Sequence, residues 1–450
     1  MFEEWKSSGK EVAVLGLGRS GIAAARLLLS RGIKVFASES DSGTDLEAKT
    51  APLGRAGAAV QLGGHDLMRV KRAIAVVVSP GIPPQVAPLE TARKAGIPIH
   101  SEIDIGFLAL PEATRIIAIT GTNGKTTTTA LTAHLLTAGG LRATAAGNIG
   151  TPLAQAAMEE DPYQWLAVEI SSFQLHDSEC FTPAIGIITN LAPDHLDRYK
   201  SLEEYYGDKA RLFRHATKES VWVLNADDPG VTAMAKAKPG QQRKFSVTAK
   251  GDGWYDRVKG RLMLGRAGLL PRKDLPLLGD HNVANALAAA LAVQAAGVGN
   301  DKIAEGLRDF RALPHRMEPV REVKGVLWIN DSKATNIAST AVALDALDRP
   351  FVLLLGGRHK GEPYSVMADK LKGRARAVVA YGEAADLIER DLKGIVKVVR
   401  ATGFDDVIAK AAGLAKTGDA VLLSPACSSY DMFRNYEDRG ARFRAAVEKM

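Results

Sequence analysis

The residues best suited to chemistry form a short loop, Thr120-Gly121-Thr122-Asn123-Gly124-Lys125-Thr126. The loop follows an apolar run at residues 115–119 and precedes a helical pattern that extends to Ala138. In such a loop, backbone N–H groups and a lysine bind phosphates, and a hydroxyl binds Mg²⁺. The usual pattern has glycine six residues before the lysine, where this chain has Ile119, so the loop is a compacted variant. We expect a nucleotide site with Mg²⁺ here, and a glycine loop with a purely structural role is the alternative.

Two further polar residues follow apolar runs of the same region. Glu169 ends the run at residues 165–168, where an acidic residue commonly holds Mg²⁺ directly or through water. His195 comes shortly after the run at residues 184–189, and open α/β sheets build their sites at the carboxyl ends of strands. A lone histidine is more often an ordinary loop or core residue than a ligand. Both interpretations of His195 stay open at this point.

A second glycine-rich turn lies near the start of the chain, at Gly16-Leu17-Gly18-Arg19-Ser20-Gly21. It follows the predicted strand Glu11–Leu15 and precedes a helical stretch through Ser30, which is the context of a dinucleotide-binding turn. Glu39 lies near the end of the next strand, where a ribose-binding acid would sit. Because small residues admit any diphosphate at a helix N-terminus, the turn predicts diphosphate binding rather than NAD in particular. A structural tight turn is the alternative.

These loops belong to three successive segments in which strands and helices alternate, as parallel sheets require. The fold class is therefore α/β, with three consecutive domains at residues 1–104, 105–312 and 313–450, of which the first and third are Rossmann-like and the central one resembles a P-loop ATPase. The almost uninterrupted alanine and leucine run at residues 283–296 predicts a buried helix. Further strands are predicted at residues 34–37, 73–78, 221–224, 326–329, 351–355, 377–380 and 420–423.

The composition is that of an ordinary globular protein, with 46% hydrophobic and 24% charged residues in a chain of 450. The start is polar, and the apolar runs are too short to cross a bilayer, so we expect neither a secretory signal nor membrane insertion. Cys180 and Cys427 are the only cysteines, which favours a reducing compartment and a cytoplasmic protein. The formal charge of +7 is scattered without a basic tract, and we expect no nucleic-acid partner.

Several motifs, taken together, resemble a known enzyme family. The loop at residues 120–127 is similar to the ATP loop shared by Mur ligases and folylpolyglutamate synthetase. Motifs that resemble later Mur ligase motifs follow in the family's order, at residues 147–150, 169–175, 194–199, 281–285 and 313–316. Residues 330–336 and 424–429 resemble the D-glutamate-adding member in particular, as does Ser171-Ser172-Phe173-Gln174. The resemblance spans nearly the whole chain.

The resemblance implies an ATP- and Mg²⁺-dependent ligase that adds D-glutamate to UDP-N-acetylmuramoyl-L-alanine through an acyl phosphate, in peptidoglycan precursor synthesis. Its partners would be small-molecule substrates, and we expect a monomer. The alternative within this class is a sister Mur ligase, or a ligase similar to folylpolyglutamate synthetase, with another amino-acid substrate. An NAD-dependent oxidoreductase and a non-catalytic nucleotide-binding protein are rivals from other classes, but neither accounts for Lys125 together with Glu169.

The resemblance also implies roles for individual residues. ATP would be bound by Gly121, Thr122, Asn123, Gly124, Lys125, Thr126, Thr127, Asn282, Asn285, Arg316 and Asp331. The UDP substrate would be bound by Gly18, Arg19, Ser20, Glu39, Ser79, Gly81, Asn148 and His195. D-glutamate would be bound by Lys333, Thr335, Lys360, Ser429, Tyr430 and Tyr436. The chain departs from the pattern at Arg358-His359-Lys360, where an acid precedes the lysine elsewhere, and at Tyr430 and Tyr436.

Catalysis would rest on Lys125, Glu169, His195 and Lys209, with two Mg²⁺ ions held by Thr126, Glu169, His195 and Lys209. Lys209 matches the family lysine that carries a carbamate. An ammonium would repel Mg²⁺, whereas a carbamate reverses the charge and offers oxygen ligands. Without the resemblance, an ordinary surface lysine on a helix would be the preferred interpretation of Lys209.

Overall fold

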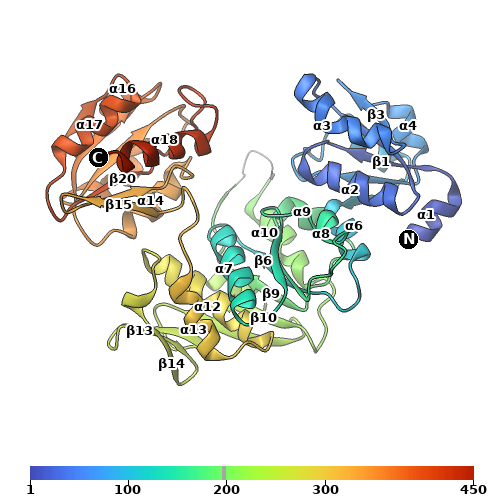
Figure 1. The fold of residues 1–450 in the computed structure, drawn as a ribbon, viewed down its shortest axis with the longest axis horizontal. Helices are drawn as coiled ribbons and strands as arrows, with labels where there is room; N and C mark the ends of the chain where they lie inside the picture. The colour runs from blue at the N-terminus through green and yellow to red at the C-terminus, as the bar shows by residue number, and fades with distance from the viewer. Residues whose placement is uncertain (195–198) are drawn as a thin grey trace. The chain divides into compact units, whose positions relative to one another are not determined.

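The computed structural model describes residues 1–194 and 199–450, and it contains three β-sheets. Two compact units divide the chain. The first unit, residues 1–274 and 284–308, contains the first two sheets, and the second unit, residues 275–283 and 309–450, contains the third sheet. The three sheets confirm the predicted α/β class, and Figure 1 shows each sheet with its own helices. The predicted domain limits at residues 104 and 312 stay a prediction.

The first sheet is fully parallel, with the strand order β3-β2-β1-β4-β5. Its strands are β1 (Glu11–Leu15), β2 (Lys34–Glu39), β3 (Ala59–Leu62), β4 (Ala75–Val78) and β5 (Ile99–Ser101). Alternate residues of β1 face opposite sides, so that Val12 and Val14 pack in one core cluster and Ala13 and Leu15 in the other. The strand order reverses between β1 and β4, which places the preferred binding position of such a sheet at their carboxyl ends.

The helices of this part are α1 (Phe2–Ser8), α2 (Arg19–Ser30), α3 (Thr44–Arg55), α4 (Leu67–Arg72), α5 (Ala87–Lys94) and α6 (Glu102–Ala109). Residues of α2 and α6 belong to the core cluster on one face of the sheet, and residues of α4 and α5 to the cluster on the other face. Helix α8 (Leu153–Ala156) packs against both α2 and α6. This packing ties the first sheet to the segment that follows it.

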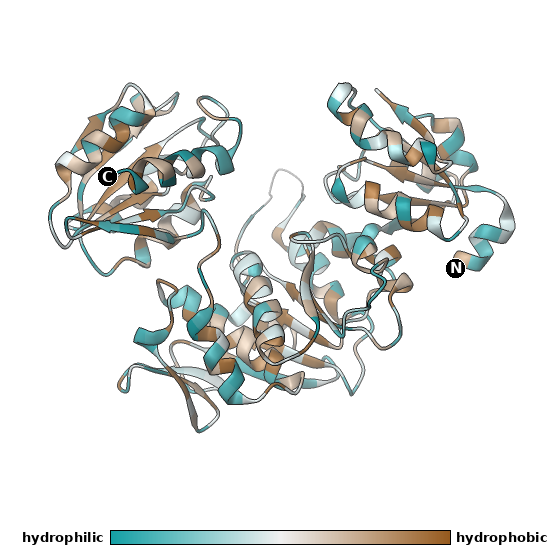
Figure 2. Cartoon of the chain, in the orientation of Figure 1, coloured by the Kyte–Doolittle hydropathy of each residue, from teal (hydrophilic) through white to brown (hydrophobic). Residues whose placement is uncertain are grey.

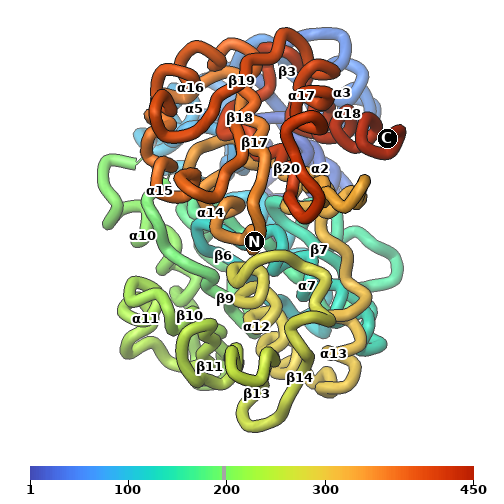
Figure 3. Tube along the Cα trace, turned by 90° about the vertical axis from the view of Figure 1, so that its left-hand side faces the viewer, coloured from blue at the N-terminus to red at the C-terminus, as the bar shows by residue number. Residues whose placement is uncertain are grey.

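The central sheet has nine strands in the order β14-β13-β12-β11-β10-β9-β6-β8-β7. Its parallel strands are β6 (Arg115–Thr120), β7 (Ala143–Gly147), β8 (Trp165–Glu169), β9 (Ile185–Ile188), β10 (Val221–Asn225), β11 (Gln241–Ser246) and β12 (Gly253–Asp256). An antiparallel extension of β12 with β13 (Arg261–Leu264) and β14 (Ala267–Pro271) was not expected from the sequence. Figure 3 follows β6, β9, β10 and β11 as neighbours across this sheet.

Helices of the central part include α7 (Lys125–Ala138), α9 (Ser172–His176), α10 (Leu202–Ala210), α11 (Pro229–Met234), α12 (Asp280–Ala295) and α13 (Asn300–Asp309). The predicted buried helix corresponds to α12, which begins three residues before the alanine-rich run. Gly279 has a positive φ of 79°, which is not helical, and the acidic Asp280 in the first turn favours a helix N-terminus there. Figure 2 shows apolar residues concentrated on the strands and polar residues on outward helix faces. Among the described residues, no helix is both long and apolar enough to cross a membrane.

The third sheet has the order β15-β16-β20-β17-β18-β19, and only β15 is antiparallel to its neighbour. Its strands are β15 (Glu318–Val323), β16 (Val326–Asn330), β17 (Phe351–Gly356), β18 (Ala375–Tyr381), β19 (Val398–Arg400) and β20 (Ala420–Leu423). Its helices are α14 (Ile337–Asp345), α15 (Ala368–Leu371), α16 (Ala385–Asp391), α17 (Phe404–Leu414) and α18 (Tyr436–Glu448). The strands β16, β20 and β17 are neighbours and parallel, so the loops that follow them share one edge of the sheet.

Candidate active site

The glycine turn after β1 is shaped by close backbone packing. Gly16 has a φ of 85°, and a Cβ on Gly21 would lie 1.8 Å from the Gly16 carbonyl oxygen. Ser79, which follows the neighbouring strand β4, donates a hydrogen bond of 2.8 Å to the same oxygen. Only glycine fits at these positions, because any side chain there would separate the turn from the sheet. The turn is therefore packed closely at the N-terminus of α2, where backbone N–H groups could meet a diphosphate.

Glu39 at the end of β2 fixes this turn. Its Oε2 accepts a hydrogen bond of 2.8 Å from the Leu17 N–H, and its Oε1 accepts bonds from the N–H and hydroxyl of Ser40. Burial alone would raise the pKa of Glu39, but these hydrogen bonds and the Asp41 N–H lower it below its ordinary value. Glu39 therefore carries a negative charge at neutral pH and holds the turn through Leu17.

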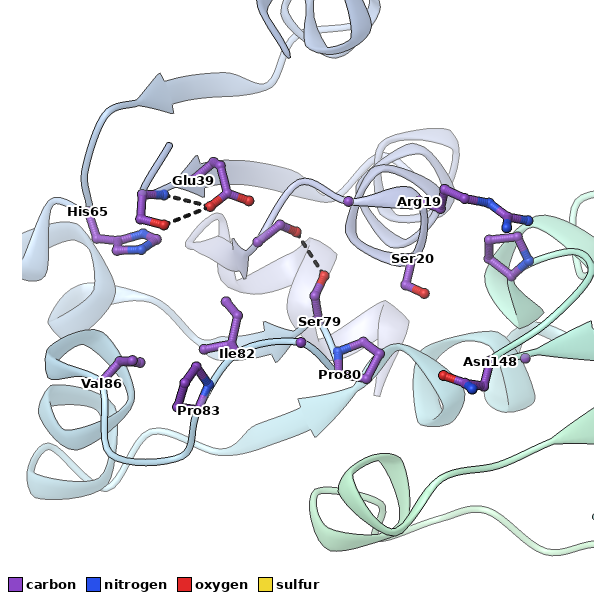
Figure 4. A pocket seen from close by; sticks show the side chains of 16 residues that line it. Arg19, Ser20, Glu39, His65, Ser79, Pro80, Ile82, Pro83, Val86 and Asn148 are labelled. Carbon is purple, nitrogen blue, oxygen red and sulfur yellow. Dashed lines mark hydrogen bonds between the residues drawn. The ribbon is translucent and has the colours of Figure 1, made fainter. Parts of the chain in front are cut away.

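A cavity of about 600 Å³ opens in front of the turn. Its lining includes all the residues predicted for the UDP substrate except His195, which lies outside the described residues: Gly18, Arg19, Ser20, Glu39, Ser79, Gly81 and Asn148. Figure 4 shows Glu39 and His65 toward one end of the cavity and Asn148 at the other. The guanidinium of Arg19 donates to the carbonyl oxygen of Gly150, two residues after Asn148. Side chains of Ile82, Pro83 and Val86 add an apolar wall that the sequence did not single out.

The phosphate loop lies between β6 and α7, as predicted. Gly124 has a φ of 82°, and a Cβ there would lie 2.4 Å from the Asn285 side chain, so glycine is required. The Nζ of Lys125 donates to the carbonyl oxygens of Gly121 at 2.9 Å and Thr122 at 2.7 Å. The ammonium therefore lies over its own loop, near the amides that start α7. A nucleotide phosphate placed at this helix N-terminus would meet both the amides and the lysine charge.

The run of threonines in α7 has structural partners. Thr128 is buried and donates a hydrogen bond of 3.1 Å to the Asn285 side chain, and Thr132 bonds to the Thr128 carbonyl. Asn285 thus joins α12 to α7 and to Gly124 of the phosphate loop. Its predicted position beside the ATP loop is consistent with this contact. Thr126 and Thr127 occupy the first turn of α7.

Glu169 supplies the feature expected of a metal ligand. It is 2% exposed at the end of β8, where it is in register with Ile119 of β6, just before the phosphate loop. Its Oε1 accepts a hydrogen bond of 2.7 Å from the Asn148 side chain, whereas its buried Oε2 has no hydrogen-bond partner among the described residues. A buried anionic oxygen without a donor is costly unless a cation or water meets it. This observation fits a cation such as Mg²⁺ at Glu169, and the Thr126 hydroxyl as a second ligand stays a prediction.

Lys209 is not a surface residue. It is 1% exposed, and its Nζ donates a hydrogen bond of 2.8 Å to the Gly121 carbonyl oxygen and lies 4.5 Å from the centre of the Tyr205 ring. Burial, followed by the charge of Lys125, lowers the pKa of Lys209 to about 7, against the opposing charges of Asp194 and Asp208. Both lysines therefore donate hydrogen bonds to the Gly121 carbonyl oxygen of the phosphate loop. The lowered pKa allows Lys209 to be neutral near physiological pH.

A second cavity, of about 320 Å³, joins these groups to the first. It contains both Lys125 and Lys209 in its lining, and it shares Pro80, Gly81 and Asn148 with the larger cavity. The remaining lining residues are Ser171, Ser172, Phe173 and Tyr205. The glycine turn and the phosphate loop are thus connected by adjoining cavities within the first unit.

The sequence interpretation assigned no role to these last four residues. Two signals could have found them. Ser171, Ser172 and Phe173 follow Glu169 directly at the carboxyl end of β8, where sites of open sheets form. Tyr205 precedes Lys209 by four residues on α10, and residues at that spacing lie on the same helix face.

Three of the residues predicted to bind ATP belong to the second compact unit: Asn282, Arg316 and Asp331. The Asn282 side chain donates to the Leu278 carbonyl at 2.8 Å. Asp331 accepts hydrogen bonds from the Ser424 hydroxyl at 2.8 Å and the Met317 N–H at 3.1 Å. Burial raises the pKa of Asp331 to about 7. Contact of these residues with a nucleotide stays a prediction.

The loops predicted to bind D-glutamate follow the neighbouring strands β16, β20 and β17. The buried Arg439 of α18 joins them: its guanidinium donates to Ser332, to the Cys427 carbonyl at 3.2 Å and to the Gly356 carbonyl at 3.4 Å. These loops carry most of the predicted residues, namely Lys333, Thr335, Lys360, Ser429 and Tyr430. Arg439 therefore places a buried positive charge at the edge of the sheet where we expect an anionic amino acid to bind.

The residues predicted to bind D-glutamate differ in their contacts and in their exposure to solvent. The Nζ of Lys333 lies 3.8 Å from the centre of the Tyr436 ring, which holds the lysine in a cation–π contact. Tyr430 is 67% exposed, and Ser429 is 2% exposed. Arg358 and Ser428 pair through their backbones, which fixes the spacing between the Lys360 and Ser429 loops.

The fold and the cavities first define a class: a multidomain α/β protein in which a glycine-rich turn and a phosphate loop line adjoining cavities. The comparisons with known proteins then give the family. Residues 10–101 match the MurD-like N-terminal domain of Mur ligases, residues 119–293 the Mur ligase middle domain, and residues 315–427 the Mur ligase glutamate ligase domain. The chain belongs to the Mur ligase family.

Full-length relatives agree with this assignment. A protein of Koribacter versatilis named UDP-N-acetylmuramoylalanine--D-glutamate ligase is 41% identical over 446 residues, 98% of each chain. A protein of the same name from Salinibacter ruber is 42% identical over 457 residues, 97% of each chain.

Solved structures agree in fold. UDP-N-acetylmuramate-alanine ligase of Thermotoga maritima has a TM-score of 0.62 at 20% identity and covers 98% of this chain and 99% of its own. MurF of Acinetobacter baumannii has a TM-score of 0.62 at 16% identity, with 97% and 93% covered.

Proposed function

We propose that the chain is an ATP-dependent ligase that joins D-glutamate to UDP-N-acetylmuramoyl-L-alanine, through an acyl phosphate, in peptidoglycan precursor synthesis. The observation that carries the proposal is the pair of adjoining cavities in the first unit. One begins at the glycine turn, the other ends at Lys125 and Lys209, and they share Asn148 and Gly81. A ligand that places its diphosphate at the turn can extend a carboxylate to the phosphate loop. The names of the full-length relatives support the same reaction.

The first step activates a poor electrophile. One oxygen of the acceptor's terminal carboxylate attacks the γ-phosphorus of ATP, the bond to ADP breaks, and an acyl phosphate forms. Two anions must approach each other for this attack, so their charges must be neutralised and their positions fixed. Lys125 and the loop amides bind the phosphates, and Asn148 orients Glu169 through its hydrogen bond of 2.7 Å.

The second step forms the amide bond. The amine nitrogen of D-glutamate attacks the acyl carbon, the bond to phosphate breaks, and the nitrogen releases a proton. The two carboxylates of D-glutamate need separate donors, which Lys333, Lys360, Thr335 and Ser429 would supply. Tyr436 keeps Lys333 in place through the contact described above, and Arg439 joins the loops that carry these donors.

Magnesium ions fit this site. Thr126 and Glu169 would hold one Mg²⁺, and His195 and Lys209 would hold a second. When bound, Mg²⁺ neutralises phosphate charge. A bare ammonium at Lys209 would oppose a nearby cation by about 4 kcal/mol, for unit charges about 4 Å apart at an effective dielectric constant near 20.

Lys209 therefore acts as a carbamate in this proposal: its neutral amine attacks dissolved CO₂, a proton is released, and an anionic oxygen pair results. The burial of Lys209 beside Lys125 favours the neutral amine that this reaction requires. Its Nζ lies within hydrogen-bond reach of the phosphate loop, at 2.8 Å from the Gly121 carbonyl. The carbamate would then face the same loop that binds the nucleotide.

We further propose that the protein works as a cytoplasmic monomer on small-molecule substrates, without nucleic acid. Domains at residues 1–104, 105–312 and 313–450 would provide the UDP, ATP and amino-acid sites. The separate sheets support the three domains, and the scattered basic residues support the absence of a nucleic-acid partner.

The test measures phosphate release with UDP-N-acetylmuramoyl-L-alanine, ATP, Mg²⁺ and a panel of D- and L-amino acids. We expect release that requires the acceptor and is fastest with D-glutamate. Fast release with another amino acid would instead identify a sister ligase. Absence of release with every amino acid would reject the ligase proposal. Thermal stabilisation by ATP with Mg²⁺ but not by NADH separates a ligase from an oxidoreductase.

A further inference from the structure

The smaller cavity has an aromatic wall, formed by Phe173, Tyr199 and Tyr205. Phe173 and Tyr205 line the same cavity as the charged groups Lys125 and Lys209. Tyr199 stands behind both: its ring is stacked on Phe173 with centres 5.6 Å apart and planes 10° apart, and it lies 5.1 Å from the Tyr205 ring. The cavity therefore has a cationic end and an apolar side.

This wall is held from several directions. Tyr205 is 1% exposed, its hydroxyl lies 3.4 Å from the Thr122 hydroxyl, and the Lys209 ammonium lies over its ring. Phe173 is in the first turn of α9, whose N-terminus is fixed by a capping box between Ser171 and Gln174. The stacking on Tyr199 and the capping box hold Phe173 in this arrangement.

The proposed reaction places the end of the acceptor substrate in this cavity. Its terminal carboxylate must reach the phosphate bound at Lys125, so the side chain of the same amino acid lies within a few bonds of the cationic end. The apolar surfaces available to that side chain are Pro80, Phe173 and Tyr205. A methyl group gains apolar contact there, whereas a branched side chain would need more of the space beside Phe173 and Tyr205.

We propose that the aromatic wall restricts the acceptor's terminal amino acid to a small side chain, such as that of L-alanine, and that Phe173 is the specificity-determining residue. This inference rests on the proposed ligase function. Apolar pockets distinguish one methylene by roughly 10- to 200-fold in kcat/KM. We therefore expect the protein to prefer an acceptor ending in L-alanine over one ending in L-valine by at least about tenfold.

The test compares kcat/KM for acceptors ending in glycine, L-alanine and L-valine, with ATP and D-glutamate saturating. Phe173→Leu removes ring volume and should lower the preference for L-alanine over L-valine by about tenfold, since the loss corresponds to more than one methylene. Phe173→Trp reduces the space and should shift the preference toward glycine. Phe181→Leu is the matched control, because Phe181 is a buried ring that packs on Phe107 and lines neither cavity.

The opposite signs expected for the two Phe173 variants keep the proposal testable if one of them is unstable. An unchanged L-alanine to L-valine ratio in an active Phe173→Leu enzyme would overturn the proposal, and so would an equal change in Phe181→Leu. If the unaltered protein releases no phosphate with the L-alanine acceptor, the ligase proposal fails instead. The two failures are thus distinguishable.

Discussion

Glu102 is a buried acid whose ionisation should lower the stability of the first unit. It is 1% exposed at the start of α6, and its Oε1 accepts a hydrogen bond of 2.6 Å from the Ala154 N–H at the start of α8. Its Oε2 is buried without a hydrogen-bond partner among the described residues. Burial raises the pKa of Glu102 from 4.5 to about 7, although the Ala154 and Leu153 N–H groups act in the opposite direction.

The sign of the effect follows from proton binding. Between pH 4.5 and pH 7, the folded protein keeps the Glu102 proton, whereas the unfolded chain has lost it. Rising pH therefore favours unfolding, at about 1.4 kcal/mol per pH unit, or about 3 kcal/mol across this range. Glu102→Gln removes the titration while keeping a carbonyl oxygen for the Ala154 N–H.

The measurement is the midpoint of thermal unfolding for the unaltered protein and for Glu102→Gln at pH 5 and pH 7. At about 2 °C per kcal/mol for a large domain, the variant should gain about 5 °C relative to the unaltered protein between the two pH values. Glu160→Gln, at an exposed position, is the control and should show no such gain. An equal pH dependence in Glu102→Gln and the unaltered protein would refute the assignment of a raised pKa.

Three further variants test the site. Lys125→Ala should reduce phosphate release by at least about 100-fold with an unchanged circular dichroism spectrum, because the lysine stabilises charge on the transferring phosphate; near-normal turnover would contradict the loop assignment. Lys209→Ala should lose most activity and recover part of it with added acetate, and full activity without acetate would exclude a carbamate role. Gly21→Ala should lower the midpoint of thermal unfolding, at a cost of about 1–3 kcal/mol or more, because its Cβ would lie 1.8 Å from the Gly16 oxygen. A Cβ on Gly18 would meet no atom within 4 Å, so Gly18→Ala should leave the midpoint of unfolding unchanged. An equal fall of the midpoint in both variants would contradict the packing argument.

The features predicted from the sequence are those encoded in contiguous residues. The glycine turn and the phosphate loop each occupy a few positions between a strand and a helix, and each begins where an apolar run ends. The predicted strands at residues 11–15 and 420–423 coincide with β1 and β20. The run at residues 73–78 predicted a longer strand than β4, which begins at Ala75, because apolar residues flanking a strand look the same in sequence.

The features that were not predicted depend on contacts between distant segments. Lys209 follows acidic residues on an amphipathic helix, and nothing near it in the sequence indicates that α10 buries it against Gly121. Glu102 likewise gains its significance from Ala154, 52 residues later. The β12–β14 extension has short strands with charged residues and no long apolar run. Three-dimensional packing, rather than local pattern, determines each of these.

The central claim is that an acyl phosphate forms on the acceptor's carboxylate, and oxygen transfer tests it most directly. The protein converts UDP-N-acetylmuramoyl-L-alanine with ¹⁸O at both oxygens of the terminal carboxylate, in the presence of ATP and D-glutamate. Mass spectrometry then measures the ¹⁸O content of the phosphate and of the product. Attack of the carboxylate on the γ-phosphorus makes one labelled oxygen the bridge to phosphorus. The account therefore predicts one ¹⁸O in the released phosphate and one in the amide of the product. Unlabelled phosphate, released together with the D-glutamyl product, would contradict it.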